Sequence, residues 1–143
     1  MRAVAAALLL ACAGCGSPAK DPAPGTPAKF SEIYAALFPA DTSAKCNSCH
    51  SQPPSNVSNG TLHVGADGDE AAAYMTLTTA TSNSHLCSGQ AYVVPGHPES
   101  SLLFTKLTAS PPFGERMPLG GGALPDAQIE MVRSWIAAGA QDD

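Results

Sequence analysis

Residues 45 to 54 read KCNSCHSQPP and gather Cys46, Cys49 and His50 within five positions. The chain has 143 residues but only 5 cysteines and 4 histidines, so chance alone would rarely place three of these nine residues within five positions. A Cys-X-X-Cys-His cluster in a chain with so few cysteines indicates chemistry rather than packing.

Several chemistries fit the cluster. In a covalent c-type haem, two thiols one helical turn apart form thioethers with the porphyrin, and the adjacent imidazole binds the iron. A dithiol redox site needs only Cys-X-X-Cys and is usual in a βαβ setting, which the sequence lacks. A zinc site would have to recruit Cys87 or His85. A structural disulfide between Cys46 and Cys49 is also possible in an exported protein. Haem is favoured because it uses both the spacing and the histidine.

A haem iron needs a ligand on its second face, and Met117 is the favoured candidate. It lies 67 residues after His50, within residues 109–124, where prolines and three consecutive glycines rule out a helix or a central strand. Nearby glycines allow the backbone to approach a porphyrin closely. The rivals for this position are three other histidines: His63, His85 and His97.

The composition is that of a soluble globular domain with an acidic balance. It is 44% hydrophobic and 13% charged, with 12 acidic residues against 7 basic ones. Because binding to a phosphate backbone needs clustered Lys and Arg, we expect no nucleic-acid partner. With 13 Gly, 13 Pro and only 6% aromatic residues, the chain has few large side chains for a core. A buried porphyrin would add apolar surface, and we expect it to pack against Phe30, Leu103, Phe104, Trp135 and Ile136.

The N-terminal sequence predicts export. Residues 1–14 combine Arg2, an apolar run too short to span a bilayer, and small residues. Small residues ahead of a cysteine resemble a bacterial lipoprotein signal, with Cys15 favoured and Cys12 the alternative for lipidation; a plain cleaved signal stays open. Residues 15–28 are proline-rich and predict an extended tether. We therefore expect a location on the periplasmic side of the bacterial envelope, with a lipid anchor to a membrane.

Residues 29–143 predict an all-α domain of short helices joined by long loops. A stripe from Phe30 to Leu37 predicts an amphipathic helix with its N-cap at Thr26 ahead of Pro27. A second helix is expected over residues 70–77, capped by Asp67 or Asp69, with Ala71, Tyr74 and Leu77 facing inward. A third is expected to begin at Pro98, and a fourth to run over residues 126–138 and end at Gly139.

Three segments carry a family resemblance: CNSCH after an amphipathic helix, VVPGHPESSLLFTKL (93–107), and GERMPLGGGALPDAQIEMVRSWIAAGA (114–140). Over about residues 30–140 the chain resembles the small monohaem cytochrome c domains of bacterial exported proteins and lipoproteins, especially those of myxobacteria and planctomycetes. The resemblance implies a cytochrome c-like fold around one covalent haem c held by Cys46 and Cys49. It implies His50 and Met117 as axial ligands, and a C-terminal helix bearing Trp135 that packs across the first helix.

Two positions depart from this pattern. Similar sequences often have Asp or Asn where His97 stands, so the following helix lacks its preferred cap. In related domains, a cysteine at the place of Cys87 often pairs with another just before the Met-Pro turn, but Phe113 occupies that place here. We expect Cys87 to be a free thiol; a bond to Cys12 or Cys15, or to another molecule, is the alternative.

The expected function is single-electron transfer with redox partner proteins of the cell envelope, not enzymatic catalysis, because two axial ligands leave no open iron position. The competing function is a haem-based sensor or small peroxidase-like catalyst in which Met117 is labile. A zinc- or disulfide-stabilised structural lipoprotein is the third possibility.

Overall fold

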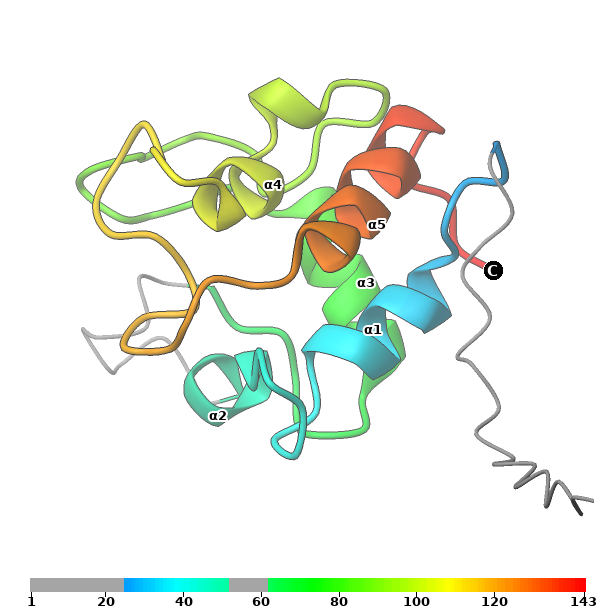
Figure 1. The fold of residues 1–143 in the computed structure, drawn as a ribbon. Helices are drawn as coiled ribbons and strands as arrows, with labels where there is room; N and C mark the ends of the chain where they lie inside the picture. Colours follow the sequence, from blue (N-terminus) through cyan, green and yellow to red (C-terminus); the bar gives the residue numbers. More distant parts are fainter. Residues whose placement is uncertain (1–24, 52–61) are drawn as a thin grey trace, which may run out of the picture.

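The computed structural model describes residues 25–51 and 62–143, which form short helices connected by long loops (Figure 1). These ranges contain no strand, only an isolated bridge between Thr81 and Ala91, in agreement with the expected all-α class. The helices are α1 (Phe30–Leu37), α2 (Cys46–His50), α3 (Glu70–Thr79), the 3-10 helix η2 (Pro98–Ser100), α4 (Leu102–Leu107) and α5 (Asp126–Ala137).

The predicted export signal, the candidate lipidation sites Cys12 and Cys15, and most of the predicted tether lie outside the described residues. Ala28, the last residue of that tether, is buried and belongs to the hydrophobic core. None of the helices within 25–51 and 62–143 is long and apolar enough to cross a membrane.

Helix α1 buries the stripe that the sequence predicted, but it begins later than the predicted cap. Its N-cap is Lys29, whose backbone N–H donates to the Glu32 carboxylate at 3.1 Å, so Thr26 and Pro27 precede the helix. A carboxylate three residues into a helix satisfies one of the backbone donors left free at its start. The buried residues are Phe30, Ile33, Tyr34 and Leu37.

Helix α3 confirms Asp69 as a cap, since its carboxylate accepts the Ala72 N–H at 3.0 Å. The inward face was predicted only in part. Leu77 is buried, whereas Ala71 is exposed and Ala73 takes its place. Residues four apart share a helix face, so burial of Leu77 brings Ala73 inward and turns Ala71 toward solvent.

The helix expected to begin at Pro98 is divided into η2 and α4. Ser101 between them has an extended backbone, and its buried hydroxyl accepts the Val94 N–H at 2.8 Å and donates to the His97 carbonyl at 2.9 Å. These bonds compete with helix continuation, which explains the break. No side-chain hydrogen bond from His97 caps η2. Helix α5 follows its prediction, and Gly139 after it adopts a φ of +103°.

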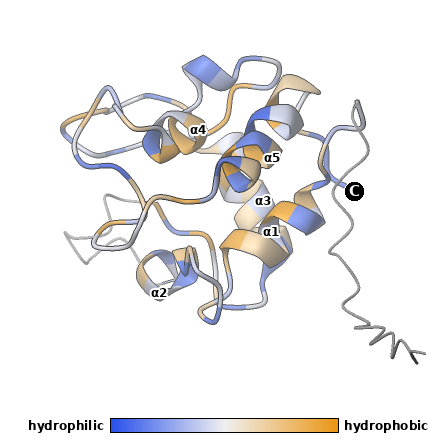
Figure 2. Ribbon diagram, viewed as in Figure 1, coloured by the Kyte–Doolittle hydropathy of each residue, from blue (hydrophilic) through white to orange (hydrophobic). Residues whose placement is uncertain are grey.

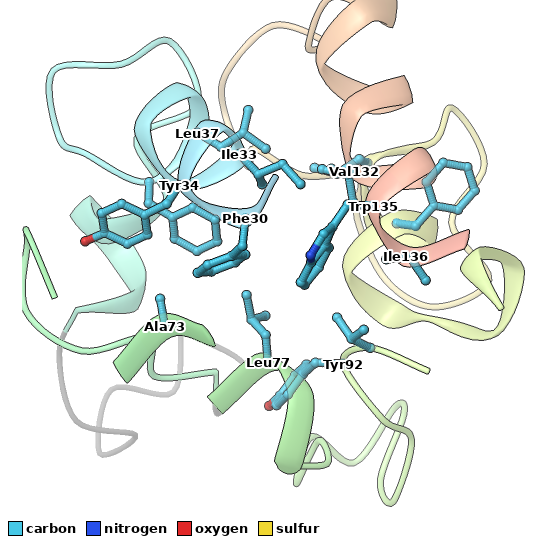
Figure 3. Packing of buried hydrophobic residues seen from close by; sticks show 14 of the residues in the cluster. Phe30, Ile33, Tyr34, Leu37, Ala73, Leu77, Tyr92, Val132, Trp135 and Ile136 are labelled. Carbon is cyan, nitrogen blue, oxygen red and sulfur yellow. The ribbon is translucent and has the colours of Figure 1, made fainter. Parts of the chain in front are cut away.

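The core lies between α1, α3 and α5. Helix α5 packs against α1 and α4, and α3 packs against α1. The rings of Phe30 and Trp135 are 5.2 Å apart between centroids, and Phe30 lies at the same distance from Tyr74. Figure 3 shows Phe30 and Trp135 pointing toward each other from their two helices. The Trp135 helix therefore packs on the first helix, as the resemblance implied, and Figure 2 shows hydrophilic residues elsewhere on the same helices.

Helix α2 is attached in a different way, mainly through hydrogen bonds. The Asn47 N–H donates to the Phe38 carbonyl at 2.9 Å, and the His50 carbonyl accepts the Val64 N–H at 2.9 Å. The Asn47 side chain is buried and donates to Asp67 at 2.9 Å and to the Tyr34 hydroxyl at 3.3 Å. These bonds hold the five-residue helix at the lower edge of the molecule in Figure 1.

Candidate functional site

A cavity of about 310 Å³ lies between α2, α4 and the loop that carries Met117. Cys46 and His50 line it from α2, Leu103 and Lys106 from α4, and Met117 from the loop. Most of the other lining side chains are apolar, among them Phe38, Leu77, Tyr92, Leu102 and Leu107. Small-molecule and cofactor sites have this character, with volumes of roughly 300–1,000 Å³ and a few polar groups in an apolar wall.

The two cysteines of the cluster have different surroundings. Cys46 lines the cavity and is half-buried, whereas Cys49 is exposed and is not part of the cavity lining. Burial, reinforced by the neighbouring Cys49, raises the pKa of the Cys46 thiol to about 11. Cys46 therefore keeps its proton at neutral pH, which suits an apolar wall. No disulfide joins Cys46 to Cys49 or to Cys87.

The His50 imidazole is oriented by a backbone carbonyl. Its Nδ1 lies 3.1 Å from the Leu62 oxygen. A carbonyl oxygen only accepts, so Nδ1 carries the proton and Nε2 keeps its lone pair. Burial lowers the pKa of His50, with a smaller contribution from His63 and an opposing one from the Leu62 bond. A neutral imidazole with a fixed tautomer is the form that binds a metal.

Met117 is half-buried and lies in the lining of the same cavity as His50. Its N–H donates to the Lys106 carbonyl at 2.7 Å, and the neighbouring Arg116 Nε donates to the Leu107 carbonyl at 2.8 Å. As expected, residues 109–124 form neither helix nor strand. The fold thus brings together two potential ligands that are 67 residues apart in sequence.

None of the three rival histidines is part of the cavity lining. His63 is half-buried and accepts the Gly65 N–H at 3.2 Å, while His85 and His97 are exposed. Of the histidines and methionines in the described part of the chain, only His50 and Met117 line the cavity.

Of the five residues expected to pack against a haem, one lines this cavity and four do not. Leu103 lines the cavity, but Phe30, Phe104, Trp135 and Ile136 are buried in the core without lining it. Helical periodicity predicts which side chains are buried but not what they contact. The cavity lining also includes four residues that the sequence did not indicate as part of a site, because their apolar character was the only signal: Phe38, Leu77, Tyr92 and Leu107.

Cys87 and Phe113 both line the cavity. The Cys87 sulfur lies 3.2 Å from the Ser82 hydroxyl, with which it shares a hydrogen bond. Cys87 forms no disulfide with Cys46 or Cys49. Its possible pairing with Cys12 or Cys15 involves residues outside the described ranges.

No protein-family model, curated protein or solved structure matches the chain. Residues 25–51 and 62–143 also contain no group of three or more His, Cys, Asp or Glu side chains arranged to hold a metal ion. The cavity lining contains one imidazole, one thioether and two thiols, from His50, Met117, Cys46 and Cys87, and polar residues such as Glu115 line it as well.

Proposed function

We propose that this protein is an exported, monohaem c-type cytochrome with a cytochrome c-like fold that transfers single electrons. The observation that supports this most strongly is the meeting of His50 and Met117 in the lining of one apolar cavity, with Cys46 beside them. A dithiol site would not require Met117, and zinc would favour further thiolate, imidazole or carboxylate ligands over a thioether.

The donors that line the cavity, together with the exposed Cys49 on the same helix, fit a c-type haem. Cys46 and Cys49 lie three residues apart on α2, where side chains are neighbours, and would form the two thioether bonds. His50 Nε2 and Met117 Sδ would bind the haem iron. The haem supplies a ferric/ferrous couple at the reduction potential that its ligands and surroundings impose.

The chain's own residues would orient the site and exclude water from it. The Leu62 carbonyl holds the His50 ring in the tautomer needed for coordination. The thioether of Met117 favours the reduced state compared with a second imidazole. Leu103 and Leu107 cover the cavity wall, and occupation of both axial positions would leave no place for a substrate. We therefore assign an electron carrier rather than an enzyme.

The proposed partners are redox proteins of the cell envelope. The chain has a formal net charge of −5, which favours a partner with a basic docking face and disfavours nucleic acid. We place the domain on the periplasmic side of the bacterial envelope, anchored to a membrane by a lipid on Cys15 or Cys12.

Covalent haem is tested by expressing the full chain with a c-haem maturation system. We expect a red protein that keeps its haem through acid-acetone extraction. Cys49→Ala should lose this retention, whereas the matched variant Cys87→Ala should keep it, because Cys87 lies outside the Cys-X-X-Cys-His motif. A colourless wild-type protein under these conditions would overturn the proposal.

The axial ligand is tested by Met117→Ala in the haem-loaded protein. The near-red charge-transfer band of the ferric protein should disappear, because that band reports sulfur coordination. An unchanged spectrum would point to His63, His85 or His97 instead. Carbon monoxide should not bind the reduced wild-type protein at neutral pH; binding would favour the sensor or catalyst alternative with a labile Met117.

A further inference from the structure

The loop that carries Met117 is fastened to the end of α4 largely through one residue, Lys106. Its backbone carbonyl accepts the Met117 N–H at 2.7 Å. Its ammonium donates to the Phe113 carbonyl at 2.7 Å and to the Glu115 carbonyl at 2.6 Å. Three of the five residues in the segment 113–117 are thus hydrogen-bonded to a single residue of α4.

The position of Lys106 in α4 explains how it can make these bonds. Helix α4 ends at Leu107, so the carbonyls of its last turn have no partner within the helix. The Lys106 carbonyl is one of these free acceptors and takes the Met117 N–H, while the Leu107 carbonyl takes Arg116 Nε. The loop therefore completes the end of the helix, and the helix supplies the loop with a rigid support.

The loop has few other means of holding this geometry. Residues 113–117 belong to neither a helix nor a strand, and Cys87, which lines the same cavity, forms no disulfide with another described cysteine. The backbone at Gly114 passes close to the ammonium: a Cβ on this glycine, whose φ is +56°, would lie in van der Waals contact with Lys106 Nζ at 3.4 Å.

We propose that Lys106 is a positioning residue, which holds residues 113–117 against α4 and thereby keeps the Met117 thioether in the cavity that His50 also lines. This inference rests on the proposed function, because it assigns Lys106 a role toward the Met117–iron bond. Removal of the ammonium leaves the Phe113 and Glu115 carbonyls without their donor, so the loop and Met117 gain freedom.

The test compares Lys106→Met with Arg133→Met in the haem-loaded full chain. Both changes remove one positive charge, but Arg133 is exposed on α5 and pairs with Glu130. In Lys106→Met we expect the near-red band of the ferric protein to weaken and amide hydrogen exchange at Met117 to accelerate by at least about tenfold, because two charged hydrogen bonds are lost and the loss of one is equivalent to about that factor. Arg133→Met should change neither, and Lys106→Arg should restore part of the band.

The outcomes separate this inference from the proposed function. A wild-type protein without the sulfur–iron band contradicts the axial role of Met117 itself. A wild-type band that survives unchanged in Lys106→Met, with only a shifted reduction potential, overturns the inference, since the lysine would then act through its charge alone. Exchange that accelerates equally throughout α5 also overturns it, because the effect would be on global stability. If Lys106→Met fails to fold, Lys106→Gln, which is too short to reach both carbonyls, is judged by the same criteria.

Discussion

The aromatic side of the domain and the cavity side bury apolar surface in different ways. On the aromatic side, Phe30 is fully buried and its ring contacts those of Tyr74 and Trp135. On the cavity side, Cys46, His50 and Met117 are only half-buried, and Leu86 and Leu119 at the cavity are 52% and 62% exposed. The protein therefore completes one side of its core with its own side chains and has an apolar cavity on the other.

The elements of the two sides account for this difference. Helices α1 and α5 have eight and twelve residues and present continuous apolar stripes to each other. The cavity side has the five-residue α2 and the irregular loop 109–124, neither of which can bury a stripe of that kind. Hydrogen bonds from Asn47 and Lys106 hold these segments in place instead. The cavity side should therefore depend more on an occupant than the aromatic side does.

The largest expected effect is that of removing the haem. A haem-free preparation should be poorly folded and lack a cooperative melt, because the apolar hollow is then left to solvent. Circular dichroism during heating measures this, and hydrogen exchange should show the weakest protection at α2 and residues 113–117. A cooperative, native-like melt of the haem-free chain would contradict the prediction and show that the aromatic side suffices.

A smaller effect, specific to each side, is expected from Trp135→Ala and Leu103→Ala in the haem-loaded protein. Trp135→Ala should lower the free energy of unfolding by about 3–5 kcal/mol, as truncation of a buried aromatic side chain does, and leave the haem absorption spectrum unchanged. Leu103 is half-buried at the cavity. Leu103→Ala should cost less stability but shift the spectrum or the reduction potential. Denaturant unfolding and spectroscopy together test this, and a haem spectrum altered only by Trp135→Ala would reverse the assignment of the two sides.

The smallest effect is expected from the side-chain carboxylate of Asp143, which lies on the aromatic side next to the start of α1. Asp143 accepts from the Ser31 hydroxyl at 2.7 Å and the Ser31 N–H at 3.1 Å in the first turn of α1, and it pairs with Lys29 at 3.4 Å. These bonds, led by that from the Ser31 hydroxyl, lower the pKa of Asp143 below its usual 3.8. The stabilisation is therefore present above pH 3.8 and is lost as the pH falls through the folded-state pKa.

Asp143→Asn should consequently reduce stability at neutral pH by about 0.5 kcal/mol or less, as is usual for exposed ion pairs. Its melting temperature should approach that of the wild type as the solution is acidified below pH 3.8. Thermal melts across this range measure the difference, and the haem spectrum should not change. A difference that persists unchanged in strong acid would mean that Asp143 acts by packing rather than by charge.

Sequence patterns were reliable where burial follows a helical period. The stripes of α1 and α5 and the Asp69 cap were all predicted, because each depends on residues three or four positions apart. The predictions failed where a nearby polar group competed with the pattern. The Ser101 hydroxyl divides η2 from α4, and the Glu32 carboxylate moves the start of α1 from Thr26 to Lys29.

The local sequence alone accounts for the candidate cluster, because Cys-X-X-Cys-His brings two thiols and an imidazole within one or two turns of a helix. Only the tertiary structure decided which distant side chains share a cavity with them. Met117 lies there because the end of α4 holds its loop, whereas Trp135 and Phe30 pack together on the other side. The physical reason is that hydrophobicity is not directional. It drives side chains out of water without specifying which partner they meet.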